Sequence, residues 1–576
     1  AETTDQWSQI VENFQPPMIR EAFSDLTLIE ARSPQEEALA IAVSIREALE
    51  HDGLNSIAVV TPDRSLARRV SVELERFDIH ADDSAGQPLF ATPAGTLARL
   101  VAEAARDGTA ISMLALLKHP LCGLGLPRAA IRSGVRALER AILRGPALPS
   151  GSANLAPAIF ELRAELADNP KQRLRASQIG LSATEWDAAV QIAGAAHLAL
   201  AGFENLFHET HSRFALGDLV DAHLKTLQAI TAGDDTAPMF ATSEDGTALI
   251  AAMAELRDLG PNARMLEIAA FDYSDLLQAL LGARPVRRNR AHVDEDTRVQ
   301  ILGTLEARLL HADHLVLGGL NEGTWPSDGK LDPWLSRSMR HQLGLNPPEQ
   351  ALGLSAHDFV QLASKPNVVL TRSLLQEGAP TQAARWLQRI EAMIGPAEQK
   401  TLVSRGTRIL KLARKLDAPA DPTGQPVMRP CPRPAVDLRP KRLSVTEIET
   451  LIRDPYAVYA KHVLKLLPFD GIGEVPNYAN RGSMLHDILQ QFLETRASDF
   501  HTPEAAEELK QIAWAEFEKI KDYPDLYARW QTRFQRISDW FLRFETERSD
   551  RVSKRLTELS GSLELDMPQF RLTGRA

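Results

Sequence analysis

A helical pattern near the C-terminal end of the chain combines a glycine with a histidine one turn later. The segment NRGSMLHDILQQFLE carries Gly482 and His486, which are four residues apart and share one face of a helix. The glycine would allow close packing, and an imidazole is an acceptable ligand in a magnesium site whose charge comes from carboxylates. The spacing alone leaves two alternatives for His486, a histidine satisfied on an apolar helix, which it favours, and a metal ligand.

The sequence ends in the pattern of a half-buried strand. Phe570 and Leu572 alternate with Arg571 and Thr573. Three acidic residues precede this strand and add acidity near it, but we assign them no metal: Glu558, Glu564 and Asp566.

Two further candidates follow expected strands of a parallel sheet. Leu315–Leu317 is followed by Gly318, Gly319 and the polar sequence LNEGTWP, and Arg372 comes just after the run Asn367–Leu370. Ligand sites of α/β sheets lie past the carboxyl ends of strands, and arginine can bind a phosphate through two hydrogen bonds. The alternatives are a glycine-driven turn and a surface ion pair.

Basic residues cluster in two stretches, although the net charge of −11 does not itself indicate nucleic-acid binding. The sequence RPVRRNR covers Arg284–Arg290, and SRGTRILKLARK covers Ser404–Lys415. Solvated helix ends are the alternative for both stretches. Only the family resemblance described below makes arginines candidate contacts to DNA phosphates; these are Arg287, Arg288, Arg290, Arg308 and Arg372.

The composition is that of an ordinary globular protein with several domains. Hydrophobic residues make up 44% and charged residues 24% of the 576 residues, which predict about four domains at ~150 residues each. Two cysteines cannot build a disulfide framework or a multi-cysteine zinc site, and they favour a reducing cytoplasm. The sequence has no run of about 18 apolar residues and no signal peptide. The absence of an initiator Met favours a processed or excised piece.

The order of apolar patterns predicts an α/β domain interrupted by a helical one. Ile57–Val60 predicts a strand buried on both faces, after a helix that starts at a Ser33–Glu36 capping box. Strand patterns return at Arg298–Leu302, His314–Leu317 and Asn367–Leu370, so we expect one parallel sheet. The expected segments are 1–97 and 291–415 for the two parts of the α/β domain, 98–290 for the helical insertion, 416–442 for a proline-rich linker, and 443–576 for a last domain.

Several strings carry a resemblance to a known family: ILGTLEARLLHADHLVLGGLNEGTWP, LTRS and RWLQRI, and earlier VVTPDRSLARRV, DDSAGQPL and LKHPLCGLG. They resemble the C-terminal half of superfamily-one helicases of the UvrD/RecB kind, and more closely the alphaproteobacterial form of AddB, the second subunit of bacterial AddAB helicase–nucleases. The resemblance implies a RecA-like, P-loop-helicase type domain with a large all-helical insertion.

The same stretches depart from those of an active motor. The stretch Thr304–Leu310 lacks the Gly-Leu-Glu of processive helicases, and no GxxxxGK[ST] loop occurs in the sequence. Arg372 occupies the position of the family's γ-phosphate arginine, which would make it a vestigial nucleotide-binding residue. We therefore expect a degenerate motor fold that grips DNA and, as in the family, scans one strand for a hotspot sequence; a role for ATP stays open.

The last segment, LSVTEIETLIRDPYAVYAKHVL with RGSMLHDILQQF, resembles the start of a RecB-type nuclease domain of the PD-(D/E)XK class. The resemblance implies that His486 is a ligand of Mg²⁺, that an aspartate follows LTGRA at once, and that an Asp-Tyr-Lys triad comes a strand later. We thus expect the piece itself, truncated before the catalytic Asp, to be nuclease-dead. Asp454 stands where related proteins carry a cluster cysteine, and Cys431 is out of register, so we expect no iron–sulfur cluster.

The resemblance implies a subunit of an ATP-dependent helicase–nuclease that processes double-stranded DNA ends for recombinational repair in the bacterial cytoplasm. Its partner would be an AddA-type helicase–nuclease subunit, and it would act as an inactive-helicase scaffold and a single-strand nuclease. Two alternatives stay open: a non-catalytic DNA-binding scaffold or interaction protein, and an ATP-driven DNA helicase. A DYKTG-like string after residue 576 would exclude the first, and a GKT loop upstream would revive the second.

Overall fold

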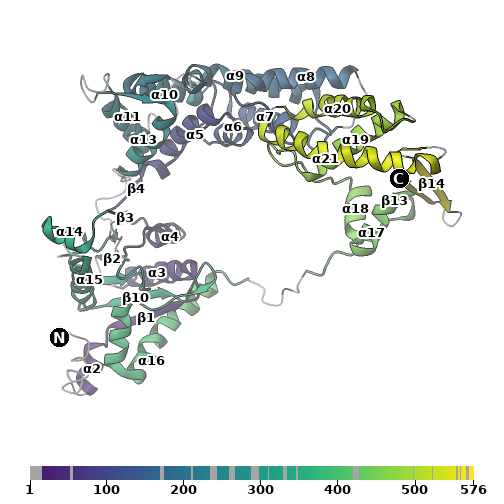
Figure 1. Ribbon diagram of the computed structural model, residues 1–576. Helices are drawn as coiled ribbons and strands as arrows, with labels where there is room; N and C mark the ends of the chain where they lie inside the picture. The colour runs from purple at the N-terminus through teal and green to yellow at the C-terminus, as the bar shows by residue number, and fades with distance from the viewer. Residues whose placement is uncertain are drawn as a thin grey trace. The chain divides into compact units, whose positions relative to one another are not determined.

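The computed structural model describes residues 16–51, 56–168, 174–208, 212–233, 243–258, 266–286, 298–308, 310–327, 334–345, 348–419, 424, 427–496, 498–521, 523–552, 555–557, 559–565 and 570–575. The chain divides into two compact units, the first made of residues 1–88 and 285–426 and the second of residues 89–284 and 427–576. Figure 1 labels their helices and strands.

A six-stranded parallel sheet forms the centre of the first unit, in the order β1-β10-β9-β2-β8-β3. The strands are β1 (Leu26–Ala31), β2 (Ile57–Val60), β3 (Asp82–Asp83), β8 (Val299–Leu302), β9 (His314–Leu317) and β10 (Val368–Ser373). β2 pairs with β8 on one side and with β9 on the other. The prediction of one parallel sheet with strands from before and after the helical segment is therefore confirmed.

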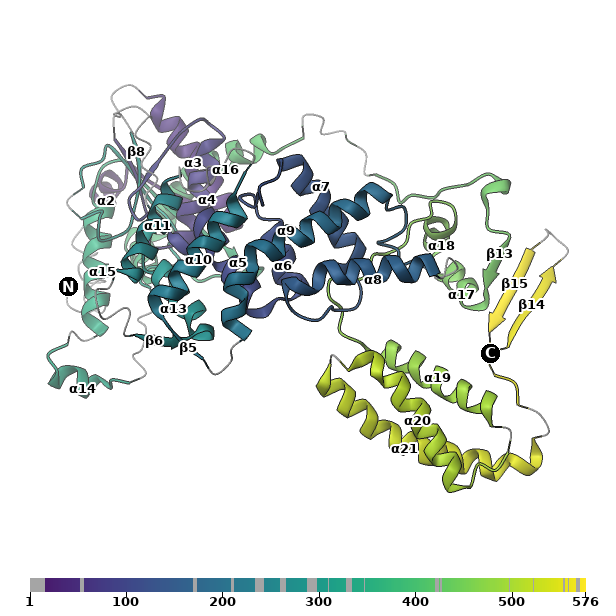
Figure 2. The ribbon, with the colours of Figure 1, turned by 90° about the horizontal axis from the view of Figure 1, so that it is seen from above.

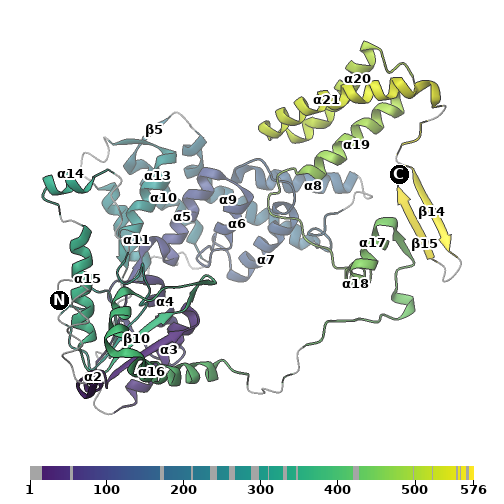
Figure 3. The same ribbon diagram turned by 60° about the horizontal axis from the view of Figure 1, so that its bottom comes forward.

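Helices cover both faces of this sheet. On one face, α3 (Pro34–Leu49), α4 (Arg64–Glu75) and the end of α16 (Arg385–Leu416) share a buried core with β2 and β9. On the other, α15 (Pro348–Ala363) and the start of α16 pack around Trp325. α16 changes direction at Gly395, whose φ of 75° is not helical. Figure 3 shows α3 and α16 beside β1 and β10. The remaining elements of this unit are α2 (Pro16–Ala22), α14 (Arg337–Gln342), β4 (Gln87–Pro88), β7 (Pro285–Val286), β11 (Leu375–Gln376) and β12 (Ala379–Pro380).

The N-terminus of α3 differs from the predicted capping box in one bond. The Ser33 hydroxyl accepts the N–H of Glu36 at 3.3 Å, as expected. The Glu36 carboxylate accepts the N–H of Arg32 at 2.5 Å, one residue before the capping serine. Both bonds satisfy N–H groups at the helix start, which fixes α3 against the sheet.

Residues 89–284 of the second unit are mostly helical. The helices are α5 (Pro93–Asp107), α6 (Ala110–Leu117), α7 (Arg128–Leu138), α8 (Leu155–Asp168), α9 (Ala183–His208), α10 (Leu216–Thr231), α11 (Glu244–Arg257) and α13 (Ala270–Gly282). The expectation of an all-helical segment was wrong in one detail, because β5 (Arg213–Ala215) pairs with β6 (Glu267–Ala269) in an antiparallel ladder. Each of these strands has three residues, too few for an alternating pattern to stand out in a sequence.

The rest of the second unit contains a helical core and a small sheet. α19 (Tyr478–Thr495), α20 (Pro503–Phe517) and α21 (Pro524–Arg548) lie side by side around buried Phe492, Phe517 and Phe534 (Figure 2). β15 (Phe570–Arg575) runs parallel to β13 (Arg442–Ser444) and antiparallel to β14 (Ser560–Leu565). The helices α17 (Val445–Arg453) and α18 (Pro455–His462) follow β13 directly.

The chain before α19 is held by backbone hydrogen bonds to the helical residues of the same unit. Gly145 donates its N–H to the carbonyl of Gly471 at 2.8 Å and accepts the N–H of Glu474 at 2.7 Å. The Arg144 guanidinium donates to the carbonyl of Asp470 at 3.1 Å and lies over the ring of Phe469. These contacts join the connecting segment 469–474 to the turn after α7.

Candidate functional site

The predicted C-terminal strand is confirmed, and it lies in the middle of its sheet. Leu572 of β15 is opposite Leu443 of β13 and Leu563 of β14. Thr573 is the register partner of Ser444, the residue with which β13 ends and α17 begins. The carboxyl end of β15 therefore lies beside the N-terminus of α17, the kind of position where α/β folds build sites.

Glu447 connects this helix start to α18. Ser444 and Glu447 form a complete capping box, with the Ser444 hydroxyl accepting the Glu447 N–H at 3.2 Å and the Glu447 carboxylate accepting the Ser444 N–H at 2.9 Å. The same carboxylate accepts a hydrogen bond from Lys461 Nζ at 2.7 Å and lies 2.8 Å from His462 Nε2. The hydrogen bonds from Lys461 and from the Ser444 N–H lower the pKa of Glu447 to about 2.

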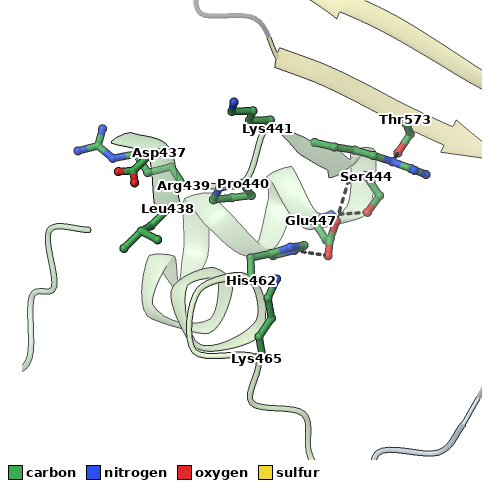
Figure 4. Close-up of a pocket in the computed structure, with 11 residues that line it drawn as sticks. Asp437, Leu438, Arg439, Pro440, Lys441, Ser444, Glu447, His462, Lys465 and Thr573 are labelled. Carbon is green, nitrogen blue, oxygen red and sulfur yellow. Dashed lines mark hydrogen bonds and ion pairs between the residues drawn. The ribbon is translucent and has the colours of Figure 1, made fainter. Parts of the chain in front are cut away.

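A cavity of about 560 Å³ opens between β13, α17, α18 and the end of β15 (Figure 4). Its lining side chains are Asp437, Leu438, Arg439, Pro440, Lys441, Arg442, Ser444, Glu447, His462, Lys465 and Thr573. Four of these are permanently cationic and two are carboxylates. Figure 4 shows His462 directed toward Glu447. Because Glu447 is already paired with Lys461, the cavity has a cationic surface suited to phosphate groups.

His486 lies on the exposed face of α19. Met484, Ile488 and Phe492 of the same helix enter the core that α19 shares with α20 and α21. His486 is therefore not a histidine on the apolar face of its helix, which was one of the two alternatives for this residue. The reason given for Gly482 was wrong, because among the described residues no neighbouring atom lies within 4 Å of where a Cβ would stand. The role of His486 as a metal ligand stays a prediction.

The carboxylates near the C-terminal strand do not complete a metal site with His486. Within the described ranges, no three His, Cys, Asp or Glu side chains lie close enough together to hold a metal ion. Glu564 of β14 is exposed and forms an ion pair with Arg571 at 2.6 Å. Glu558 and Asp566 lie outside the described residues. The donors described here do not by themselves fit Mg²⁺, which normally needs carboxylate oxygens.

Arg372 of the first unit is engaged with protein groups. Its side chain is buried at the end of β10, where Nη1 lies 3.2 Å from Glu30 and Nε donates to the Asn321 side-chain oxygen at 3.2 Å. Nη2 donates to both oxygens of Thr381, each at 3.2 Å. Arg372 thus joins the ends of β1 and β10 to the loop after β9 and to the residue that follows β12.

The loop after β9 forms a packed turn. A glycine-driven turn was the alternative to a ligand site at this position. Gly319 has a φ of 76° and donates its N–H to buried Glu37 at 2.9 Å. The indole N–H of Trp325 donates to the Gly318 carbonyl at 3.0 Å. Thr371 also donates to Glu37, at 2.7 Å. Burial nevertheless dominates and raises the pKa of Glu37 to about 7.

The other predicted DNA contacts fall into two groups. Arg308 forms a bidentate ion pair with Asp358, with distances of 2.7 and 2.9 Å. Arg287, Arg288 and Arg290 lie outside the described residues. The basic stretch Ser404–Lys415 forms the C-terminal end of α16, where the side chains of Arg408 and Arg414 are more than half exposed and pair with Glu47 and Glu36. This agrees with the alternative of a solvated helix end.

A row of exposed arginines on α21 was not recognised in the sequence. Arg529, Arg533 and Arg536 lie at the spacing i, i+4, i+7 and line a surface hollow of about 400 Å³. The spacing could have revealed them, because it places all three on one face of a helix.

Comparison with known proteins supports a nuclease relationship for one part of the chain. A family model of the PD-(D/E)XK nuclease superfamily matches residues 442–576. An uncharacterized protein of Rickettsia conorii is 24% identical over 268 residues, which are 45% of this chain and 30% of that protein. An uncharacterized protein of Rickettsia bellii is 32% identical over 128 residues, 22% of this chain and 15% of that protein.

The matches cover less than a third of the length of these curated relatives. Within the described residues, no helix is both long and apolar enough to cross a membrane. The sheet β13-β15-β14, the capping box of α17 and the helices α19 to α21 all belong to the matched range. Residues 442–576 of this chain form a domain of the PD-(D/E)XK nuclease superfamily.

Proposed function

We propose that the complete protein is a DNA nuclease subunit that processes double-stranded DNA ends, with the PD-(D/E)XK domain at residues 442–576 as its nuclease domain. The family match over this range is the observation that carries the proposal. The cationic cavity beside β15 supports it, because its lysine and arginine side chains suit the phosphates of a DNA strand. The cleaved strand would pass the carboxyl end of β15, where the resemblance places the first catalytic aspartate.

The first unit would serve as a DNA-binding scaffold of RecA-like, degenerate-helicase type, as in AddB. Its parallel sheet with helices on both faces is the architecture that this reading requires. The bonds of Arg372 to Glu30 and Asn321 support a structural role for this arginine. ATP hydrolysis would then belong to a partner of the AddA type, with which the protein would form a heterodimer.

The experiment compares the complete protein with its His486→Ala variant on an end-labelled single strand in the presence of Mg²⁺. We expect the substitution to abolish cleavage and to leave DNA-end binding, measured in EDTA, unchanged. His501→Ala, at another exposed histidine of the same domain, is the matched control and should cleave normally. Full cleavage by His486→Ala would refute the ligand assignment. Binding without any cleavage by the wild-type complete protein would favour the non-catalytic scaffold.

A further inference from the structure

One face of α21 combines exposed arginines with exposed aromatic rings. Arg529, Arg533 and Arg536 are followed on the same face by Trp540 and Phe544, and all five side chains are exposed. We call these five residues the α21 stripe. It runs for about 22 Å along the helix, at roughly 1.5 Å per residue. Asp525 and Glu547 lie at its two ends, and Asp539 adjoins Arg536 at its side.

The opposite face of α21 packs into a core, which fixes the orientation of the helix and therefore of the stripe. Trp530, Phe534 and Phe541 are at most 7% exposed and pack into the core shared with α19 and α20. The helix is continuous over 25 residues from Pro524 to Arg548. The stripe is therefore displayed on a rigid element, so binding to it would not require ordering of the backbone.

The three arginines of the stripe have no ion-pair partner among the described residues. Several exposed arginines elsewhere, such as Arg408 with Glu47 and Arg453 with Glu449, do have one. Three unpaired guanidinium groups within two turns repel one another. Such an arrangement suits an anion that presents several charges in a row.

The aromatic end of the stripe exposes apolar ring surface to water, which costs free energy. Trp540 is 56% exposed and Phe544 is 39% exposed. Their rings are stacked, with centroids 5.3 Å apart and planes at 15°, and the guanidinium of Arg548 lies 4.7 Å from the Phe544 centroid. The face of Trp540 that is turned away from Phe544 is the one onto which a further planar group can stack.

We propose that the α21 stripe binds single-stranded nucleic acid, with phosphates on its arginines and unpaired bases on its aromatic rings. The length of the stripe corresponds to roughly six nucleotides at a phosphate spacing of ~3.4 Å per strand. Stacking on protein rings requires bases that are free of a duplex, which selects a single strand. The proposal rests on the nuclease function proposed above and adds where the strand is held.

The test is fluorescence anisotropy of a labelled 12-nucleotide single strand with the 576-residue chain, in EDTA so that no cleavage occurs. The variant R529Q/R533Q/R536Q should bind at least about 10-fold more weakly, and the slope of log K against log salt should fall by about 2, at ~0.7 per phosphate contact. The variant W540A/F544A should lose on the order of 10-fold in affinity with an unchanged salt slope, because it removes stacking only.

Two matched controls have the same chemistry elsewhere in the chain. R128Q/R132Q/R136Q removes an exposed row of arginines from α7, and F160A removes an exposed ring from α8; both should bind within about twofold of wild type. Equal losses in the α7 and α21 variants would overturn the proposal. So would unchanged binding by W540A/F544A, equally tight binding of a duplex of the same length, or a loss of partner-subunit association alone.

The experiments distinguish a wrong strand-binding proposal from a wrong nuclease proposal. Strand binding that depends on the stripe, in a complete protein that never cleaves, would contradict only the nuclease activity. Normal cleavage sensitive to His486→Ala, with binding independent of the stripe, would contradict only the strand-binding surface. Near-ultraviolet circular dichroism of each variant checks that the helical core is intact.

Discussion

The arginines of α16 and those of α21 show that a basic cluster is not by itself a binding surface. In α16, Arg408 forms a bidentate pair with Glu47 at 2.7 Å, Arg414 pairs with Glu36 at 2.5 Å, and Arg405 donates to the carbonyl of Leu26 at 2.7 Å. In α21, none of the three stripe arginines has an ion-pair partner within the described part of the chain. Arginines that are already paired stabilise the fold and are less available to a ligand.

The largest expected effect is at Arg372. Arg372→Ala would leave Glu30 of β1 and Asn321 of the loop after β9 without their partner, and it should lower the free energy of unfolding by about 3 kcal/mol. Urea denaturation of the 576-residue chain measures this change. Arg533→Ala is the matched control on α21 and should change stability by less than about 0.5 kcal/mol. Unchanged stability of Arg372→Ala would contradict its structural role.

The second effect concerns a buried carboxylate next to the same strand ends. Glu37 has its pKa raised to about 7 by burial, so the folded state holds a proton that the unfolded state loses above pH ~4.5. Stability of the first unit should therefore fall as the pH rises from about 4.5 to about 7, by on the order of 3 kcal/mol. Melting temperatures across this range should show the loss, and Glu37→Gln should flatten it. An identical pH profile in both proteins would contradict the raised pKa.

The opposite pH dependence is expected at Glu447, with a smaller effect. Its pKa is lowered to about 2 by Lys461 and the Ser444 N–H, so its contribution to stability is complete above pH ~4.5 and is lost as the pH falls toward 2. Glu447→Gln keeps the shape but removes the charge, and should reduce the acid sensitivity of the nuclease domain. Circular dichroism during acid titration measures the midpoint. A midpoint that does not move would contradict the capping and pairing described for Glu447.

The smallest effect is expected at the exposed pair of α16. Arg408 and Glu47 have side chains 59% and 34% exposed, so solvent screens their attraction. Arg408→Ala should reduce the free energy of unfolding by less than about 1 kcal/mol. A double-mutant cycle with Glu47→Ala isolates the pair energy. A coupling above about 2 kcal/mol would show that exposed pairs of α16 carry much more stability than we infer.

The sequence predicted elements whose pattern is long or strongly apolar. β2, β9 and β15 were found because their apolar residues are continuous or alternate cleanly. β1 was missed because its sequence LTLIEA contains a glutamate, Glu30, that pairs with Arg372 of β10. Only a contact between residues 342 positions apart explains that glutamate, and no local pattern can show it.

The site was predicted less completely than the fold. His486 lies on the exposed face of α19 and its role as a metal ligand stays a prediction, whereas the packing reason for Gly482 does not hold. The pairing of Arg308 with Asp358 and of Arg372 with Glu30 depends on tertiary contacts that a sequence does not display. The α21 stripe was visible in principle, because its spacing is helical, but its exposure is known only once the core face of α21 is known.

The most direct measurement is the affinity of the 576-residue chain for a labelled single strand, with paired and unpaired arginines changed in parallel. Arg533→Gln/Arg536→Gln on α21 should lower the affinity about 10-fold and reduce the salt dependence by about 1.4, at ~0.7 per phosphate contact. Arg408→Gln/Arg414→Gln on α16 should leave the affinity and its salt dependence within experimental error of wild type. Equal losses in the two variants, or a larger loss in α16, would contradict the conclusion that the arginines of α21, and not the paired arginines of α16, meet DNA.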